Sequence, residues 1–180
     1  MADHEGHAER WLRKSVRLPG FDYASVAAYF VTICWAERRP VLGIVEGDQV
    51  KLSELGAIVA EEWVDSCRIR QEIVLDEFVV MPNHLHAIVF IVGATGGRPA
   101  GRSQDDCPQG DRRSPLRFGP APRSLSSLVA GFKSAVTRRV RQATSNDQTS
   151  VWQRSFYDHV IRGDDDLLRI RGYIRGNPSQ

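Results

Sequence analysis

Apolar residues change their spacing several times along the chain, and these changes predict a series of strands. The run AYFVTICW at 28–35 is rich in β-branched and aromatic residues, as strands are. The segment QVKLS at 49–53 predicts a second, short strand. The runs IVLDEFVVM and HLHAIVFIV predict a hairpin that turns at Pro82–Asn83, and SVWQRSFYDHVI at 150–161 predicts a last strand.

Between and after these strands the apolar spacing becomes helical in three places. One helix is predicted from the N-cap Ser53 to about Cys67, on the stripe Leu52, Leu55, Val59 and Trp63. A second follows the cap Ser124, and its apolar stripe comprises Leu125, Leu128, Val129, Phe132, Ala135, Val136 and Val140. The residues Arg138 and Arg141 fall on the opposite side of that helix.

A third helix is predicted from the acidic run Asp164–Asp166 to about Asn177–Pro178. Acids at a helix start are explained by capping and by the helix dipole, although a metal-binding cluster is the alternative. The buried stripe of this helix is expected at Leu167, Ile170 and Ile174. Gly172 and Gly176 are expected to weaken it.

The order of elements predicts an α+β fold, in which an antiparallel β-sheet has helices packed on it. Residues 1–20 are expected to form a basic N-terminal arm, and residues 21–180 a single domain. The segment 93–123 is rich in Gly, Pro and Arg and has almost no apolar periodicity, so it is expected to be a flexible basic loop.

Composition narrows the class of protein. The chain has 180 residues and a net charge of +2, but its arginines are clustered, which suits a polyanionic partner. Three cysteines in no CxxC pair are expected to be reduced and structural. No apolar stretch approaches the length of a membrane span and the N-terminus lacks a signal-peptide centre, so a cytoplasmic protein with no membrane partner is expected.

Two histidines stand one residue apart in the second strand of the hairpin. Because side chains alternate along a strand, His84 and His86 are predicted to share one face while Leu85 packs in the core. Imidazoles at this spacing can reach one divalent ion at about 2.0–2.2 Å. They can equally be polar residues on a solvated sheet face, and an HxH pair alone does not decide between the two.

The C-terminal helix offers a phenol and an amide one turn apart, at Tyr173 and Asn177. If this helix packs on the histidine face, both groups arrive near the metal. A phenol with a pKa of about 10 is a poor nucleophile at neutral pH and needs a cation or base nearby. The alternative is that Tyr173 is an amphipathic core residue and Asn177 a helix cap before Pro178.

The blocks EFVVMPNHLHAIVF, GFKSAVTRRV, VWQRSFYDHVIR and RIRGYIRGNP, with RLPGFDYASVAAYFVTIC before them, resemble the REP-associated tyrosine transposases. These are a branch of the single-tyrosine HUH transposases, and the resemblance covers about residues 10–178. It implies a ferredoxin-like or RRM-like sheet with the histidines on a central strand. It also implies cleavage and rejoining of single-stranded DNA beside hairpins through a covalent 5′-phosphotyrosine.

On this resemblance His84, His86 and Asn177 would bind Mg²⁺ or Mn²⁺, and Tyr173 would attack the scissile phosphate. The expected partner is single-stranded DNA with hairpins, bound by a monomer or homodimer. The basic residues expected to contact phosphates are Arg13, Lys14, Arg17, Lys133, Arg138 and Arg141.

Other readings stay open from the sequence. Tyr157 and His159 are a rival nucleophile and base, although structural or DNA-contacting roles are expected of them. A non-cleaving single-stranded DNA- or RNA-binding protein that keeps the fold is the main alternative function. A metal-dependent hydrolase that activates water is a third.

Overall fold

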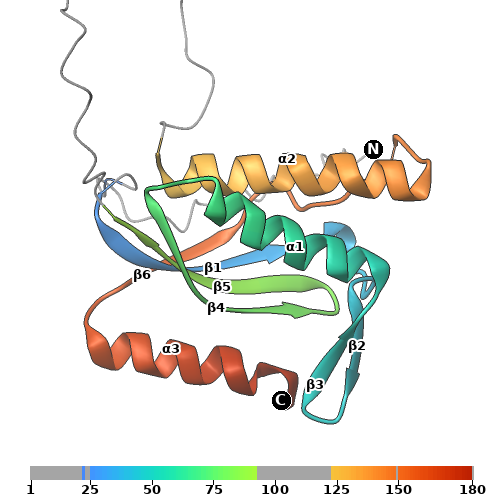
Figure 1. Ribbon diagram of the computed structural model, residues 1–180. Coiled ribbons are helices and arrows are strands. Elements are labelled where there is room, and N and C mark those ends of the chain that lie inside the picture. The colour runs from blue at the N-terminus through green and yellow to red at the C-terminus, as the bar shows by residue number, and fades with distance from the viewer. Residues whose placement is uncertain (1–21, 23–24, 93–122, 149, 180) are drawn as a thin grey trace, which may run out of the picture.

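The computed structural model describes residues 22, 25–92, 123–148 and 150–179 (Figure 1). The main sheet has four strands in the order β4-β5-β1-β6, and every neighbouring pair is antiparallel. The predicted N-terminal arm and nearly all of the predicted 93–123 loop lie outside the described residues. The strands of the sheet are β1 (Ala27–Cys34), β4 (Ile73–Met81), β5 (His84–Ile91) and β6 (Tyr157–Ile161).

Helices cover both faces of this sheet (Figure 1). The helices α1 (Glu54–Arg68) and α2 (Leu125–Thr144) lie together on one face, and α3 (Asp164–Gly176) lies on the other. Short 3-10 turns follow β1 and α3, as η1 (Ala36–Arg38) and η3 (Asn177–Ser179). The fold is therefore the predicted α+β class. In the described part of the chain, no helix is both long and apolar enough to span a bilayer.

The two predicted serine caps start α1 and α2. The Ser53 side chain accepts a hydrogen bond from the Gly56 N–H at 3.1 Å. Ser124 and Ser127 form a reciprocal capping box, in which each hydroxyl accepts from the other residue's N–H at 3.2 Å. Satisfying these otherwise unpaired donors fixes where each helix begins. The starts of both helices could thus be predicted from sequence.

The two faces of the sheet bury unequal amounts of apolar surface. The side under α1 and α2 holds the main core, in which Val59, Trp63 and Phe132 are fully buried. The side under α3 buries a much smaller cluster, which consists of Ile88, Ile161, Ile170 and Ile174 with partly buried neighbours. Most of the hydrophobic stabilisation therefore comes from the α1/α2 side.

A second, two-stranded sheet stands beside the main one. It pairs β2 (Gly43–Glu46) with β3 (Gln49–Leu52). The predicted strand at 49–53 is confirmed as β3, but its partner β2 was missed because GIVE is too short to show alternation. Leu52, expected in the stripe of the first helix, instead ends β3 and is 38% exposed.

The prediction of a strand over 150–161 was wrong for its first half. Only Tyr157–Ile161 form β6, while Trp152 makes an isolated bridge to Trp35. The ammonium group of Lys133 donates hydrogen bonds to the carbonyls of Gln153 and Ser155, at 2.8 and 3.0 Å. These carbonyls therefore do not pair with a neighbouring strand. A side chain from α2 thus replaces strand pairing at this point.

The edge strand β4 contains a bulge. Its register against β5 shifts between Leu75 and Phe78, so that one extra residue is inserted. Asp76 and Glu77 lie in the shifted segment, and both form ion pairs with α3. In a regular strand, adjacent residues point to opposite faces, so the bulge lets both carboxylates reach the same helix.

Candidate active site

The alternation predicted for β5 is confirmed. Leu85, Ala87, Val89 and Ile91 pack in the main core, whereas Ile88 and Phe90 belong to the cluster under α3. His84 and His86 share that second face and lie opposite Cys34 and Thr32 of β1. His86 is only 6% exposed. His86 is therefore not a side chain on a solvated face, because α3 covers it, whereas His84 is half-buried.

The two imidazole rings converge on each other. Their Nε2 atoms are 2.8 Å apart and their ring centroids 4.3 Å apart. Two ligand nitrogens at about 2.1 Å from one metal ion and at right angles to each other would be about 3.0 Å apart. The pair therefore has the separation that two adjacent metal ligands require.

The other nitrogen of each ring has a hydrogen-bond partner. Nδ1 of His84 donates to the Asn83 side-chain oxygen at 2.6 Å, which leaves a lone pair on Nε2 of the neutral ring. Nδ1 of His86 lies 2.8 Å from the Thr32 hydroxyl, which can accept or donate. Partners of this kind fix the orientation and tautomer of metal-binding histidines.

Both rings are held neutral. Burial, followed by the neighbouring His84, lowers the pKa of His86 to about 4. Burial, followed by the charge of Arg38, also lowers the pKa of His84 below its usual value. A neutral imidazole is the form that binds metal, so near pH 7 protons do not compete strongly for this pair.

Tyr173 of α3 completes the cluster. Its hydroxyl lies 3.3 Å from Nε2 of His86, and the two ring centroids are 5.3 Å apart. Phe30 of β1 stacks on His86 at 5.2 Å and meets the Tyr173 ring edge-on at 6.1 Å. Tyr173 is nevertheless 41% exposed, so this residue is not closed off from solvent.

The rotation of α3 about its axis is fixed from two sides. Ile170 and Ile174 bury the middle of its sheet-facing surface. Arg171 Nε donates to Asp76 at 2.8 Å, and Arg175 Nε donates to Glu77 at 3.1 Å. Residues two positions away from Tyr173 lie almost opposite it around a helix, so these ion pairs hold one flank while Tyr173 faces β5 and β1 on the other.

Asn177 lies one turn beyond Tyr173, at the start of η3, and is only 8% exposed. The structure thus brings His84, His86 and Tyr173 into contact and leaves Asn177 buried at the end of the same helix. No group of three or more His, Cys, Asp or Glu side chains that could hold a metal ion occurs among the described residues. A metal here would use the two imidazoles together with an amide oxygen or substrate.

A small pocket of about 230 Å³ opens beside His84. It is lined by Thr32, Cys34, Arg38, Asn83 and His84. Sequence reasoning missed Thr32, Arg38 and Phe30 as members of the site, because they come from β1 and η1 and reach it only through strand pairing. Asn83 could have been noticed, since it precedes His84 directly.

The rival pair occupies different positions. Tyr157 lies opposite Thr32 in β6, is 45% exposed and meets the Phe30 ring at 6.5 Å. His159 instead pairs with Asp166 of α3, with Nε2 and Oδ2 2.9 Å apart. Asp166 also accepts from the Arg162 N–H at 3.2 Å. The N-cap of α3 is Gly163, which has no side-chain cap, so the acids do not cap this helix in the expected way.

The expected phosphate contacts have different surroundings. Arg13, Lys14 and Arg17 lie outside the described residues. Arg138 is exposed and Arg141 half-buried on α2, away from its buried stripe as predicted. Lys133 uses its ammonium group for the two backbone carbonyls already described, so its contact with DNA stays a prediction.

Comparisons with known proteins give a relative in sequence and similar solved structures. The chain is 33% identical over 166 residues to an uncharacterized protein of Haemophilus influenzae, covering 92% of this chain and 88% of that protein. A REP-associated tyrosine transposase bound to a REP hairpin superposes with a TM-score of 0.55 at 21% identity, over 88% of this chain and 70% of that chain. No family model matches the chain. The chain therefore belongs to the family of the Haemophilus influenzae protein and has the fold of a REP-associated tyrosine transposase.

Proposed function

We propose that the protein is a single-tyrosine transposase that cuts and rejoins single-stranded DNA beside hairpins, with Tyr173 as nucleophile and His84, His86 and Asn177 as metal ligands. The observation that carries the proposal is the 3.3 Å approach of the Tyr173 hydroxyl to a histidine pair whose Nε2 atoms are 2.8 Å apart. The two motifs are separated by 87 positions in the chain and meet in one place. The fold of a hairpin-bound transposase supports the choice of substrate.

The reaction is a transesterification at phosphorus. The Tyr173 oxygen forms a bond to the scissile phosphorus and loses its proton to solvent, while the bond to the 3′ oxygen breaks. The leaving strand takes up a proton as its 3′ hydroxyl, and the other strand stays on the enzyme as a 5′-phosphotyrosine. Attack by a 3′ hydroxyl on this diester reverses the step and rejoins DNA without an external energy source.

The ligand set favours Mn²⁺ over Mg²⁺, because imidazole nitrogens suit the softer ion while Mg²⁺ prefers oxygen. A bound divalent ion would polarise a phosphoryl oxygen and neutralise its charge. The chain's own contribution is to hold both imidazoles neutral and oriented through Thr32 and Asn83, and to hold Tyr173 beside them. Arg38 lies at the edge of this site and adds positive charge where a phosphate would approach.

The experiment is a selection for covalent adducts. The full chain is incubated with Mn²⁺ and a pool of single-stranded oligonucleotides that carry a stem–loop and randomised flanks. Protein–DNA species that survive denaturant are isolated and sequenced. We expect adducts with the wild type, none with Tyr173→Phe, and undiminished adducts with the matched control Tyr157→Phe, whose ring also contacts Phe30.

The outcomes separate the alternatives. Cleavage without any adduct would indicate a hydrolase that activates water. Oligonucleotide binding that weakens with salt, with neither cleavage nor adduct in the wild type, would indicate a binding protein that keeps the fold. An adduct that persists in Tyr173→Phe would refute Tyr173 as the nucleophile.

A further inference from the structure

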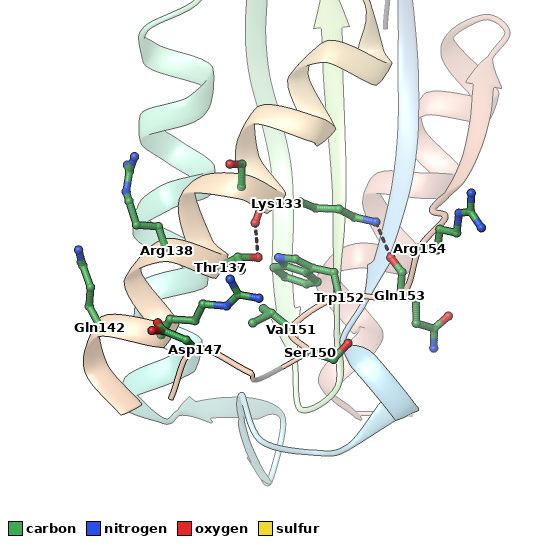
Figure 2. Close-up of a pocket in the computed structure, with 12 residues that line it drawn as sticks. Lys133, Thr137, Arg138, Gln142, Asp147, Ser150, Val151, Trp152, Gln153 and Arg154 are labelled. Carbon is green, nitrogen blue, oxygen red and sulfur yellow. Dashed lines mark hydrogen bonds between the residues drawn. The ribbon is translucent and has the colours of Figure 1, made fainter. Parts of the chain in front are cut away.

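A large pocket lies between α2 and the segment 150–154, away from the histidine pair. Its volume is about 720 Å³. Figure 2 shows the ring of Trp152 extending from this segment toward the helix, with Arg138 on one side of it and Arg154 on the other. The charged side chains that line the pocket are Lys133, Arg138, Arg141, Asp147 and Arg154.

The pocket presents hydrogen-bond donors that lack acceptors. The indole N–H of Trp152 and Nε of Arg141 are buried, and neither has a partner in the described part of the chain. Within that part, Arg138, Arg141 and Arg154 also form no ion pair with a carboxylate, unlike Arg139 on the next face of α2, which pairs with Glu61 at 2.7 Å. Buried donors without acceptors are costly, so this lining favours a ligand rich in acceptor oxygens.

Lys133 contributes to the shape of this pocket more than to its capacity to bind an anion. Its ammonium group donates to the carbonyls of Gln153 and Ser155 and lies 5.9 Å from the centre of the Phe156 ring. These contacts keep the carbonyls of Gln153 and Ser155 from pairing with a neighbouring strand. The segment 150–154 that they hold in place forms one wall of the pocket (Figure 2). The arginines remain as the groups able to meet an anion.

Backbone hydrogen bonds join this wall to the end of β1 that carries the candidate active site. The Gln153 N–H donates to the Cys34 carbonyl at 3.0 Å, and Cys34 lies opposite His84 in the sheet. The Trp35 N–H donates to the Asn83 carbonyl at 2.9 Å, and Asn83 also accepts from the His84 ring. Gln153 is thus separated from His84 by the intervening strand β1, that is by two interstrand spacings or about 10 Å, and the pocket lies on the α2 side of the sheet while His84 lies on the α3 side.

From these observations we propose that the pocket binds a backbone phosphate of the same DNA strand that Tyr173 attacks, a few nucleotides from the scissile phosphate. The inference rests on the proposed function for the identity of that strand. Arg138 and Arg154 flank the pocket and do not converge on one point, which suits a phosphate chain that crosses it better than a single small anion. Contacts of this kind position a strand without reading its sequence.

The test is a scan with neutralised phosphates. The probe is a stem–loop with thymidine flanks, in which one phosphate at a time is replaced by a methylphosphonate, and the affinity of the full chain is measured by fluorescence anisotropy. We expect at least one flank position at which neutralisation weakens wild-type binding several-fold. In the double variant Arg138→Gln/Arg154→Gln, neutralising the phosphate at that position should no longer weaken binding. The slope of log affinity against log salt concentration should become shallower by about 0.7 for each lost contact.

A charge-matched control separates a site from general electrostatics. Lys51→Gln/Arg68→Gln also removes two exposed cations, each in a surface ion pair outside the pocket. It should keep the wild-type scan. If both double variants lost the position-specific sensitivity equally, or if Arg138→Gln/Arg154→Gln kept the wild-type scan, the proposed phosphate site would be refuted. All four substituted side chains are exposed, and thermal unfolding checks that each variant is folded.

The scan also separates this proposal from the cleavage mechanism. A position-specific loss in the scan without any tyrosine adduct would support the pocket and refute the cleavage chemistry. Adduct formation, without any phosphate position whose effect depends on Arg138 and Arg154, would support the cleavage chemistry and refute the pocket. Failure of the full chain to bind the probe at all would refute both.

Discussion

Replacing Thr32 by valine should weaken metal binding while leaving the fold intact. Valine keeps the β-branched shape that suits a strand and replaces the hydroxyl, which lies 2.8 Å from Nδ1 of His86, with a methyl group. To use Nε2 as a ligand, His86 must carry its proton on Nδ1, and Thr32 is the acceptor for that proton. Without it the buried N–H has no partner, because His86 is 6% exposed.

The size of the effect follows from two sources. Loss of a group that orients a metal-bound histidine costs about 10- to 100-fold in metal affinity. That range equals about 1.4–2.7 kcal/mol. The metal-free protein also leaves one nitrogen of a buried ring unpaired, which should lower the free energy of unfolding by about 1–3 kcal/mol. The metal and stability effects are separable because the second is measured without metal.

Calorimetric titration with Mn²⁺ measures the first effect, and chemical denaturation without metal measures the second. Thr32→Ser keeps the hydroxyl and is the matched control, so it should retain most of the wild-type affinity. Wild-type Mn²⁺ affinity in Thr32→Val would refute the role assigned to this hydroxyl. So would an equal loss in Thr32→Ser, because the hydroxyl would then not be the cause.

Two glycines and one acid give further expectations. Gly172→Ala should raise the free energy of unfolding by up to about 1 kcal/mol, because a Cβ there meets nothing within 4 Å and alanine is the better helix former. Gly56→Ala should instead destabilise by about 1–3 kcal/mol or more, since its Cβ would lie 1.9 Å from the Leu42 carbonyl oxygen; denaturation curves that show a loss of stability in Gly172→Ala would contradict the first expectation, and curves that show none in Gly56→Ala would contradict the second. Hydrogen bonds from His159, then Arg169, lower the pKa of Asp166 from 3.8 to about 2, so wild-type stability should fall as the pH drops through that interval. Asp166→Asn should lack this part of the acid dependence, and identical acid titrations of stability in both proteins would count against the ion pair.

Much of the fold could be predicted from sequence because its signals are local. Ser53 and Ser124 mark helix starts, and the alternation in β5 places His86 on the face opposite Leu85. The prediction of a strand over 150–161 was wrong for its first half because the conformation there depends on Lys133, which reaches the segment from α2. No pattern within the segment itself contains that information.

The candidate site divides in the same way. The spacing of His84 and His86, and of Tyr173 and Asn177, could be read from the chain, and α3 does bring the phenol to the histidines. The hydrogen-bond partners of the histidine rings could not be predicted from the sequence, because Thr32 meets His86 only through the register of β1 and β5. The bulge that lets Asp76 and Glu77 hold α3 is likewise a property of strand pairing.

The unequal burial on the two sheet faces bears on how the helix carrying Tyr173 can move. Its attachment consists of a small apolar cluster, a part-buried ion pair to Asp76 and a more exposed one to Glu77, whereas α1 and α2 are part of the main core. Lifting its 13 residues therefore exposes far less apolar surface than global unfolding does. Amide hydrogens of α3 should exchange with solvent through such partial openings, faster as ionic strength rises, while those of α1 and α2 stay protected. A strand end bound to this helix could then change partners without the rest of the molecule unfolding.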